Sequence, residues 1–169
     1  MNKMNLTCYL DLDGCIGDWE SQAIKVLDGN AINSVSKKEL WQKITEYDAT
    51  VEKFFENISK MNYADAMVAY LESVFDKVII LTASGHTPKD VAEQKIKWVK
   101  NHYSHLDVIV VRKSVDKAQY VDSNSILIDD REVSIDAWTK AGGTGILHTG
   151  FESTKNAVEH LRQYSIKGS

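Results

Sequence analysis

Proline and cysteine are scarce in this chain of 169 residues. It contains one proline, Pro88, and two cysteines, Cys8 and Cys15. No stretch is rich in proline, glycine or serine, so the sequence shows neither a flexible linker nor a low-complexity segment. Two cysteines in a chain without a secretory signal predict buried, reduced thiols rather than a disulfide framework.

Long apolar runs are missing as well. No stretch approaches 18 consecutive apolar residues, and the N-terminus leads into a short strand-like segment without a signal-peptide core. We therefore expect a soluble, cytoplasmic protein that has no membrane partner. The length is typical of one domain with a modest insertion.

Positive charge is the third scarcity. Lysine and arginine number 20 against 24 aspartates and glutamates, and residues 15–73, with six basic and ten acidic side chains, account for the whole net charge of −4. Gripping a long nucleic acid requires many cations that neutralise phosphates. Such a partner is therefore not expected, whereas a single phosphate on a small molecule needs only a local positive site.

Short apolar runs alternate with amphipathic stretches along most of the chain. Strands are predicted at residues 6–10, 77–82, 108–111, 126–128 and 145–148. Helices are predicted from Pro88 to about residue 103, near 115–121, at 132–141 and at 153–164. Uninterrupted apolar strands separated by such helices predict an α/β fold, a Rossmann-like parallel sheet covered by helices on both faces.

Residues 15–73 interrupt this alternation and have only helical patterns. Ser36 and Glu39 form a capping box, Thr50 is expected to cap a helix carrying Phe54 and Phe55, and Asn62 another. We expect residues 1–14 and 74–169 to form the core domain. Residues 15–73 would form a small helical cap inserted after the first strand.

Carboxylates directly follow two of the predicted strands. Asp11 and Asp13 come after the first strand, Asp129 and Asp130 after the fourth, and Thr82 ends the second. The carboxyl ends of parallel strands meet at one edge of a sheet, where ligands bind. Clustered carboxylates repel each other unless a cation intervenes, and hard oxygen ligands suit Mg²⁺. This edge is predicted to bind a metal and a phosphate.

Four ordered segments now carry a family resemblance: YLDLDGCIGDW, LTAS, a lysine at 113 or 117, and ILIDD. They resemble the motifs of the haloacid dehalogenase-like (HAD) superfamily of phosphohydrolases. Within it, the chain looks like the 5'(3')-deoxyribonucleotidase family, through GDWE, FFENISKM, VDKAQYV and ILIDDR.

The resemblance implies a role for each carboxylate. Asp11 would attack phosphorus to form an aspartyl-phosphate, and Asp13 would protonate the leaving oxygen and then activate water. Mg²⁺ would be held by Asp11, Asp13 through its carbonyl, and Asp129, with Asp130 behind them rather than as a direct ligand. A general acid is not needed to release a halide, so Asp13 disfavours dehalogenation.

The resemblance also implies the phosphate site. Thr82, Ala83 and Ser84 would contact phosphate oxygens together with one lysine. Lys113 directly follows a strand, whereas the segment VDKAQYV favours Lys117, so both stay candidates.

The expected activity is Mg²⁺-dependent hydrolysis of a small phosphomonoester, with a (deoxy)nucleoside monophosphate favoured. Trp19 and Phe55 are candidates for stacking on a base. Alternatives are a phosphatase for another small metabolite or for a nucleic-acid terminus, and an idle HAD-like fold used only for binding. A second copy of the chain is a candidate partner.

Overall fold

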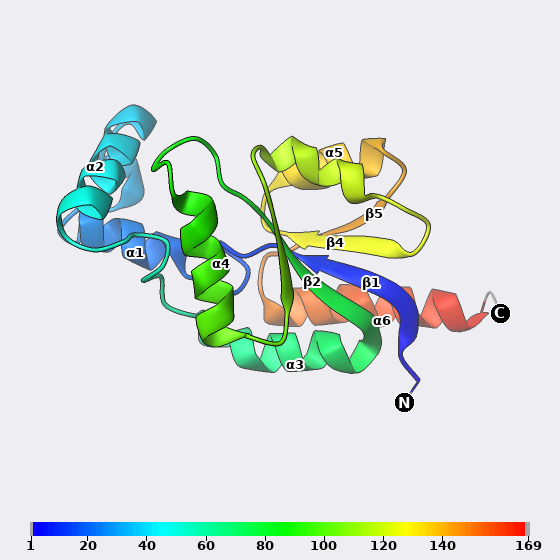
Figure 1. Ribbon diagram of the computed structural model, residues 1–169. Helices are drawn as coiled ribbons and strands as arrows, with labels where there is room; N and C mark the ends of the chain where they lie inside the picture. The colour runs from blue at the N-terminus through cyan, green and yellow to red at the C-terminus, as the bar shows by residue number, and fades with distance from the viewer. Residues whose placement is uncertain (1, 168–169) are drawn as a thin grey trace.

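A five-stranded parallel sheet forms the centre of the protein. The computed structural model describes residues 2–167, with side chains up to Tyr164. The strands lie in the order β3-β2-β1-β4-β5 (Figure 1). Their bounds are β1 Met4–Leu10, β2 Phe75–Ala83, β3 Asp107–Val111, β4 Ser125–Asp129 and β5 Thr144–Leu147. All neighbouring pairs are parallel, which confirms the predicted fold class.

Helices cover both faces of this sheet. α3 and α6 lie on one face and α5 on the other (Figure 1). The helical elements are α1 Trp19–Val26, α2 Lys37–Thr50, α3 Ala64–Val74, α4 Val91–His102, α5 Glu132–Lys140 and α6 Phe151–Lys167, with 3₁₀ turns η1 Ile32–Ser34 and η2 Ser114–Tyr120. Residues of β1 alternate between the layers, because successive strand side chains point to opposite faces. Cys8 and Leu10 join the larger core cluster, while Tyr9 packs against the smaller one around Trp138.

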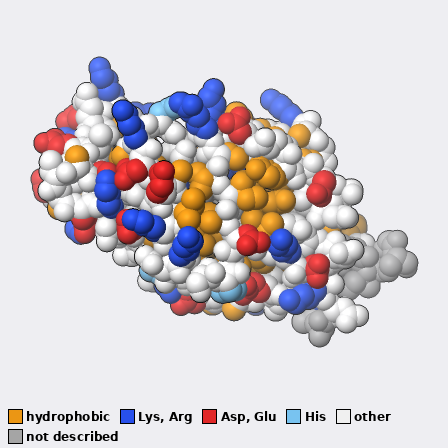
Figure 2. All heavy atoms as spheres, in the orientation of Figure 1, with side chains coloured by type: hydrophobic (Ala, Val, Ile, Leu, Met, Phe, Trp, Pro, Cys, Tyr) orange, Lys and Arg blue, Asp and Glu red, His pale blue; other side chains and the backbone are white. Residues whose placement is uncertain are grey.

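The strand β3 forms one edge of the sheet. Its residues Val108, Ile109 and Val110 are half-buried. In Figure 2, hydrophobic side chains gather over this region, and charged side chains of both signs surround them. Within residues 2–167, no helix combines the length and the apolar character needed to cross a membrane.

The inserted segment after β1 divides into two parts. α1 and α2 lie beyond the carboxyl ends of the strands, whereas α3 covers the sheet and runs directly into β2 (Figure 1). Buried α3 residues Met67, Val68 and Leu71 belong to the main core. The range 15–73 expected to form a cap thus includes one helix of the sheet's covering layer. We call residues 15–62 the α1–α2 unit.

Residues 51–58 differ from the expected helix. Thr50 ends α2 rather than beginning a new helix, and its hydroxyl donates to the Glu46 carbonyl at 2.7 Å. The amides of Phe54, Phe55 and Glu56 donate to side-chain oxygens instead of helix carbonyls. By contrast, the predicted cap of α2 is confirmed, because Ser36 Oγ accepts from the Glu39 amide at 3.1 Å.

The helix after β2 begins later than predicted. The sequence places its start at Pro88, but α4 begins at Val91 with Asp90 at its N-cap. The Asp90 carboxylate does not cap a backbone amide. It forms an ion pair with Lys53 at 2.8 Å and accepts from Gln94 Nε2 at 3.1 Å. Asp90 thus contacts Lys53 of the α1–α2 unit and Gln94 of its own helix instead of capping α4.

Candidate functional site

The first β-strand delivers its carboxylate to the middle of the sheet edge. Leu10 pairs with Ile80 of β2 and with Ile128 of β4. The Asp11 amide continues this ladder by donating to the Ile128 carbonyl at 2.9 Å. Asp11 consequently lies between the ends of β2 and β4.

A buried lysine joins two of the carboxylates. Lys117 Nζ lies 2.8 Å from Asp11 Oδ1 and 2.6 Å from Asp129 Oδ2, and its side chain is 2% exposed. Burial opposes ionisation of Asp11, but the charge and hydrogen bond of Lys117 hold the pKa of Asp11 below its usual value. Burial would lower the pKa of Lys117, but Asp11 and Asp129 raise it overall. The amine is therefore a fixed positive charge in this site.

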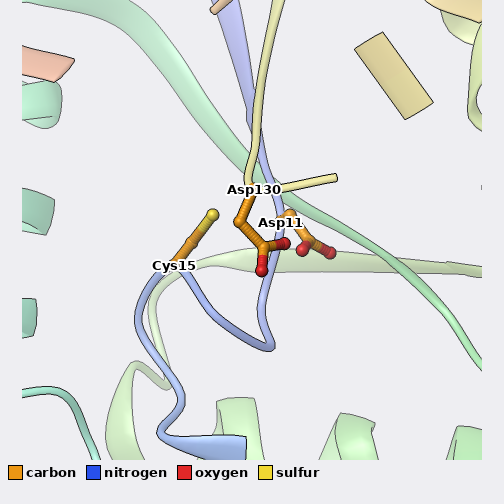
Figure 3. Close-up of side chains that lie close together, drawn as sticks. All are labelled: Asp11, Cys15 and Asp130. Atoms are coloured by element: carbon orange, nitrogen blue, oxygen red, sulfur yellow. The ribbon is translucent and has the colours of Figure 1, made fainter. Parts of the chain in front are cut away.

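Asp129 and Asp130 have different surroundings. Asp129 Oδ2 is bonded to Lys117, and its Oδ1 accepts from the Arg131 amide at 3.0 Å. Asp130 lies with Asp11 and Cys15 in a group whose ligand atoms are within 4.8 Å of one another (Figure 3). Burial and the charge of Asp11 raise the pKa of Asp130 to about 8. Asp130, predicted to lie behind the metal ligands, therefore belongs to the group around Asp11, whereas Asp129, predicted as a ligand, contacts Lys117 and the Arg131 amide.

This group fits a hard cation. Asp11 and Asp130 offer carboxylate oxygens, which Mg²⁺ prefers. The thiol of Cys15 is a soft donor, and burial raises its pKa well above the usual value, so it stays protonated. Gly14 leaves room for this arrangement: its φ is +82°, and a Cβ there would overlap the Asp130 carboxylate.

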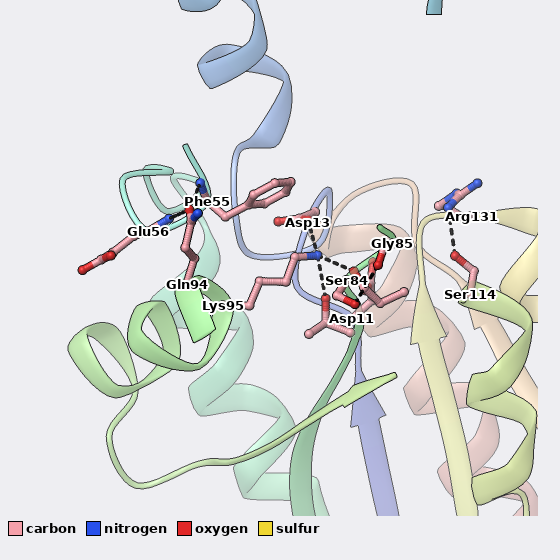
Figure 4. Close-up of polar contacts among 12 residues, drawn as sticks. Asp11, Asp13, Phe55, Glu56, Ser84, Gly85, Gln94, Lys95, Ser114 and Arg131 are labelled. Atoms are coloured by element: carbon pink, nitrogen blue, oxygen red, sulfur yellow. Dashed lines mark hydrogen bonds and ion pairs between the residues drawn. The ribbon is translucent and has the colours of Figure 1, made fainter. Parts of the chain in front are cut away.

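A second buried lysine was missed from the sequence. Lys95 Nζ on α4 lies 2.8 Å from Asp13 Oδ2, 3.1 Å from Thr82 Oγ1 and 2.6 Å from the Ala83 carbonyl (Figure 4). Its side chain is 5% exposed. The signal for it was present, because Lys95 is four residues after Val91 and four before Val99, on the buried face of α4.

The remaining predicted phosphate residues occupy the same edge. Ser84 donates its amide to the Val111 carbonyl at 2.8 Å and its hydroxyl to the Gly85 carbonyl at 3.1 Å. Lys113 is exposed and, in the described structure, forms no ion pair with the carboxylates that contact Lys117. The geometry thus brings Thr82 and Lys117 to the carboxylates, while Ser84 and Lys113 lie further along the wall.

These residues line one cavity of about 760 Å³. Asp11, Asp13 and the two buried lysines lie at one part of its wall. The α1–α2 unit supplies the apolar part, made of Trp19, Ile32, Leu40, Trp41, Phe55 and Met61. Trp41 and Phe55 are nearly parallel, with ring centroids 6.5 Å apart, and Lys95 Nζ lies 5.0 Å from the Phe55 centroid. Trp19 and Phe55, predicted as stacking residues, both reach this wall; Trp41 was not singled out.

Gln94 holds this wall against α4. It is 1% exposed, and its Oε1 accepts from the amides of Phe55 at 2.9 Å and Glu56 at 3.3 Å (Figure 4). Its Nε2 donates to Asp48 Oδ1 at 2.8 Å and to Asp90 at 3.1 Å. Because Gln94 adjoins Lys95 in sequence, one turn of α4 positions both the apolar wall and the polar centre.

Comparison with known proteins bears on the fold. No family model matches the chain, and no curated protein matches its sequence. A hydrolase from Streptococcus pneumoniae superposes with a TM-score of 0.56 and 15% identity, over 92% of this chain and 100% of the other. The fold is that of HAD hydrolases.

Two further structures agree with this. A candidate phosphatase from Clostridium difficile has a TM-score of 0.54 and 14% identity, covering 86% of this chain and 85% of its own. A candidate HAD-hydrolase from Bacillus subtilis, bound to magnesium, has a TM-score of 0.51 and 12% identity, covering 85% and 86%. At these identities the likeness concerns the fold alone.

Proposed function

We propose that the protein is a Mg²⁺-dependent phosphomonoesterase that hydrolyses (deoxy)nucleoside monophosphates through an aspartyl-phosphate. One observation carries the proposal. A single cavity is lined by Asp11 and Asp13, each paired with a buried lysine, and by the aromatic side chains of the α1–α2 unit. A phosphate and a nucleobase are chemically suited to these two parts.

In this proposal Asp11 is the nucleophile and Asp13 the general acid and base. Asp11 attacks phosphorus, the alcohol leaves with a proton from Asp13, and water that Asp13 deprotonates then releases inorganic phosphate. The overall reaction consumes one water and yields a nucleoside and phosphate. Lys95 supports this assignment, since its contact with Asp13 orients the carboxylate beside Thr82.

Lys117 and the metal would balance the negative charges of Asp11 and of the substrate phosphate. Lys117 would hold Asp11 ionised, while Lys95 and Thr82, which contact each other, would bind phosphate oxygens, on which charge is spread in the transition state. Asp11 and Asp130, with the Asp13 carbonyl, would hold Mg²⁺. When bound, the ion offsets the repulsion between the anionic nucleophile and the anionic substrate. The magnesium form of the Bacillus subtilis structure supports the choice of ion.

The α1–α2 unit would act as the cap over this chemistry. It lies beyond the carboxyl ends of the strands and contributes Trp19, Trp41 and Phe55 to the cavity (Figure 1). Stacking on such side chains is worth about 1–3 kcal/mol per base. This wall favours a nucleotide over a small sugar phosphate.

A substrate panel tests the proposal. Purified protein is assayed for phosphate release from deoxynucleoside and ribonucleoside monophosphates, sugar phosphates and p-nitrophenyl phosphate, with Mg²⁺ or with EDTA. We expect nucleotides to have the highest kcat/KM, EDTA to abolish release, and Asp11→Asn to be inactive on every substrate. A preference for sugar phosphates contradicts the nucleotide assignment, and full activity of Asp11→Asn contradicts the mechanism.

A further inference from the structure

Four cations of the cavity have no carboxylate partner among the residues that the structure describes. Lys37, Arg112, Lys113 and Arg131 line the same cavity as Asp11, and none of them forms an ion pair among the described residues. Three of the four follow the carboxyl ends of β3 and β4. We call Arg112, Lys113 and Arg131 the cation arc.

Side chains other than carboxylates hold the two arginines in place. Arg112 donates from Nε and Nη2 to His86 Nδ1 at 2.9 and 2.7 Å, and the Arg112 carbonyl accepts from the Gly85 amide. Arg131 Nη1 donates to Ser114 Oγ at 2.8 Å (Figure 4). These contacts orient the guanidinium groups without pairing either of them with a carboxylate among the described residues.

The cation arc exceeds what one phosphate requires. Lys95 and Lys117 already serve the part of the cavity around Asp11 and Asp13. The protein as a whole has a net charge of −4, so the excess of positive charge at the cation arc is opposite in sign to the net charge. Uncompensated cations on the wall of a cavity attract an anionic ligand group. Planar guanidinium groups are especially suited to phosphate oxygens.

We propose that the cation arc binds a second phosphate of the substrate, so that the cavity accepts a nucleoside bisphosphate and hydrolyses one of its two esters. This inference rests on the proposed function and deepens it. A nucleoside bisphosphate has a group for each part of the wall: the reacting phosphate, the base and the second phosphate. The reaction consumes one water and yields a nucleoside monophosphate and inorganic phosphate.

The charge distribution favours a small ligand over a polymer. The α1–α2 unit faces the cavity, and residues 15–73, which include it, carry ten acidic against six basic side chains. Further phosphates extending from the cation arc along this unit would meet like charge. A nucleoside bisphosphate has only two anionic groups. One would lie near Lys95 and Lys117 and the other at the cation arc.

The test compares thymidine 3',5'-bisphosphate with thymidine 5'-monophosphate and 3'-monophosphate. In the unmodified protein we expect kcat/KM for the bisphosphate to be about tenfold higher, mainly through KM, since exposed charge-assisted contacts are individually modest. Arg112→Gln and Arg131→Gln should each lower the ratio of bisphosphate to monophosphate kcat/KM about threefold to fivefold. The double variant should bring the ratio close to one. The control, Lys140→Gln, removes a cation at the other end of α5 and should keep the ratio.

Equilibrium binding separates this inference from the proposed function. Isothermal titration of the unmodified protein with both ligands should show the same preference for the bisphosphate, weaker at high salt and lost in the double variant. Equal affinities, or a preference that survives in the double variant, would overturn the inference even if monophosphates are hydrolysed. Faster hydrolysis of a 5'-phosphorylated oligonucleotide than of the bisphosphate would also overturn it. Bisphosphate binding that depends on both arginines, without hydrolysis of any ester, would support the binding role of the cation arc and would refute the proposed hydrolysis.

Discussion

Replacing Gln94 by methionine should destabilise the protein by about 2–4 kcal/mol. Methionine nearly preserves the volume but removes all four hydrogen bonds of the buried amide. The buried Phe55 amide and the part-buried Glu56 amide lose their acceptor, at a cost of about 1–3 kcal/mol for each buried group left unpaired. Asp48 keeps two other donors, Phe54 N and Lys53 Nζ, so losing the hydrogen bond from Gln94 costs less stability at Asp48.

Urea unfolding of the variant measures this change directly. The matched control is Gln42→Met, at an exposed position of α2, for which we expect a change within about 0.5 kcal/mol. Hydrogen exchange should also show faster exchange at the amides of Phe55 and Glu56. A Gln94→Met protein as stable as the control variant would refute the reasoning, because the four contacts would then contribute nothing net.

Gln94→Glu adds a pH dependence to the same test. The new carboxylate would lie close to Asp48 and Asp90, which now accept from Nε2. Burial and like charge raise the pKa of such a group in the folded state above its unfolded value. The folded state then binds more protons, so stability relative to the unmodified protein should rise as the pH falls from 7 to 5. A stability difference between the variant and the unmodified protein that is constant from pH 7 to 5 would contradict the buried position of residue 94 beside Asp48 and Asp90.

Three further predictions concern the site. Gly14→Ala should cost about 1–3 kcal/mol in urea unfolding, because its φ of +82° and the contact with Asp130 both exclude a Cβ; unchanged stability would contradict this. Lys117→Ala should reduce kcat by about 10²-fold or more, and far more than Lys113→Ala, since Lys117 contacts Asp11 and Lys113 does not among the described residues; the opposite ranking in steady-state kinetics would assign the role to Lys113. Trp19→Ala should lower kcat/KM for nucleotides about tenfold while largely sparing p-nitrophenyl phosphate, and equal losses would indicate damaged packing.

The sheet could be predicted because its signals are local. Apolar runs define the strands, and the polar residues that end them, such as Asp11 and Thr82, fall together once the strands are parallel. The resemblance of VDKAQYV favoured Lys117 over Lys113 as the lysine of this site, but its pairing with Asp11 was not predicted.

The contacts made by buried polar side chains could not be predicted in this way. Gln94 and Lys95 sit on the inner face of α4, where the apolar pattern indicates packing, and their partners are far away in sequence. The turns at 51–58 arise for the same reason, because side-chain acceptors replace the helix carbonyls. The different environments of Asp129 and Asp130 depend on which carboxylate Lys117 reaches. The sequence around Asp129 and Asp130 does not show which of the two carboxylates Lys117 contacts.

Trapping a phosphorylated enzyme tests the central claim most directly. The protein is mixed with Mg²⁺ and thymidine 5'-monophosphate labelled in its phosphate, quenched in acid within milliseconds, and the labelled peptide is mapped by mass spectrometry. We expect the label on the peptide that contains Asp11, sensitive to hydroxylamine, and absent from Asp11→Asn. Label on a different residue, or hydrolysis by Asp11→Asn at the rate of the unmodified protein, would contradict the account.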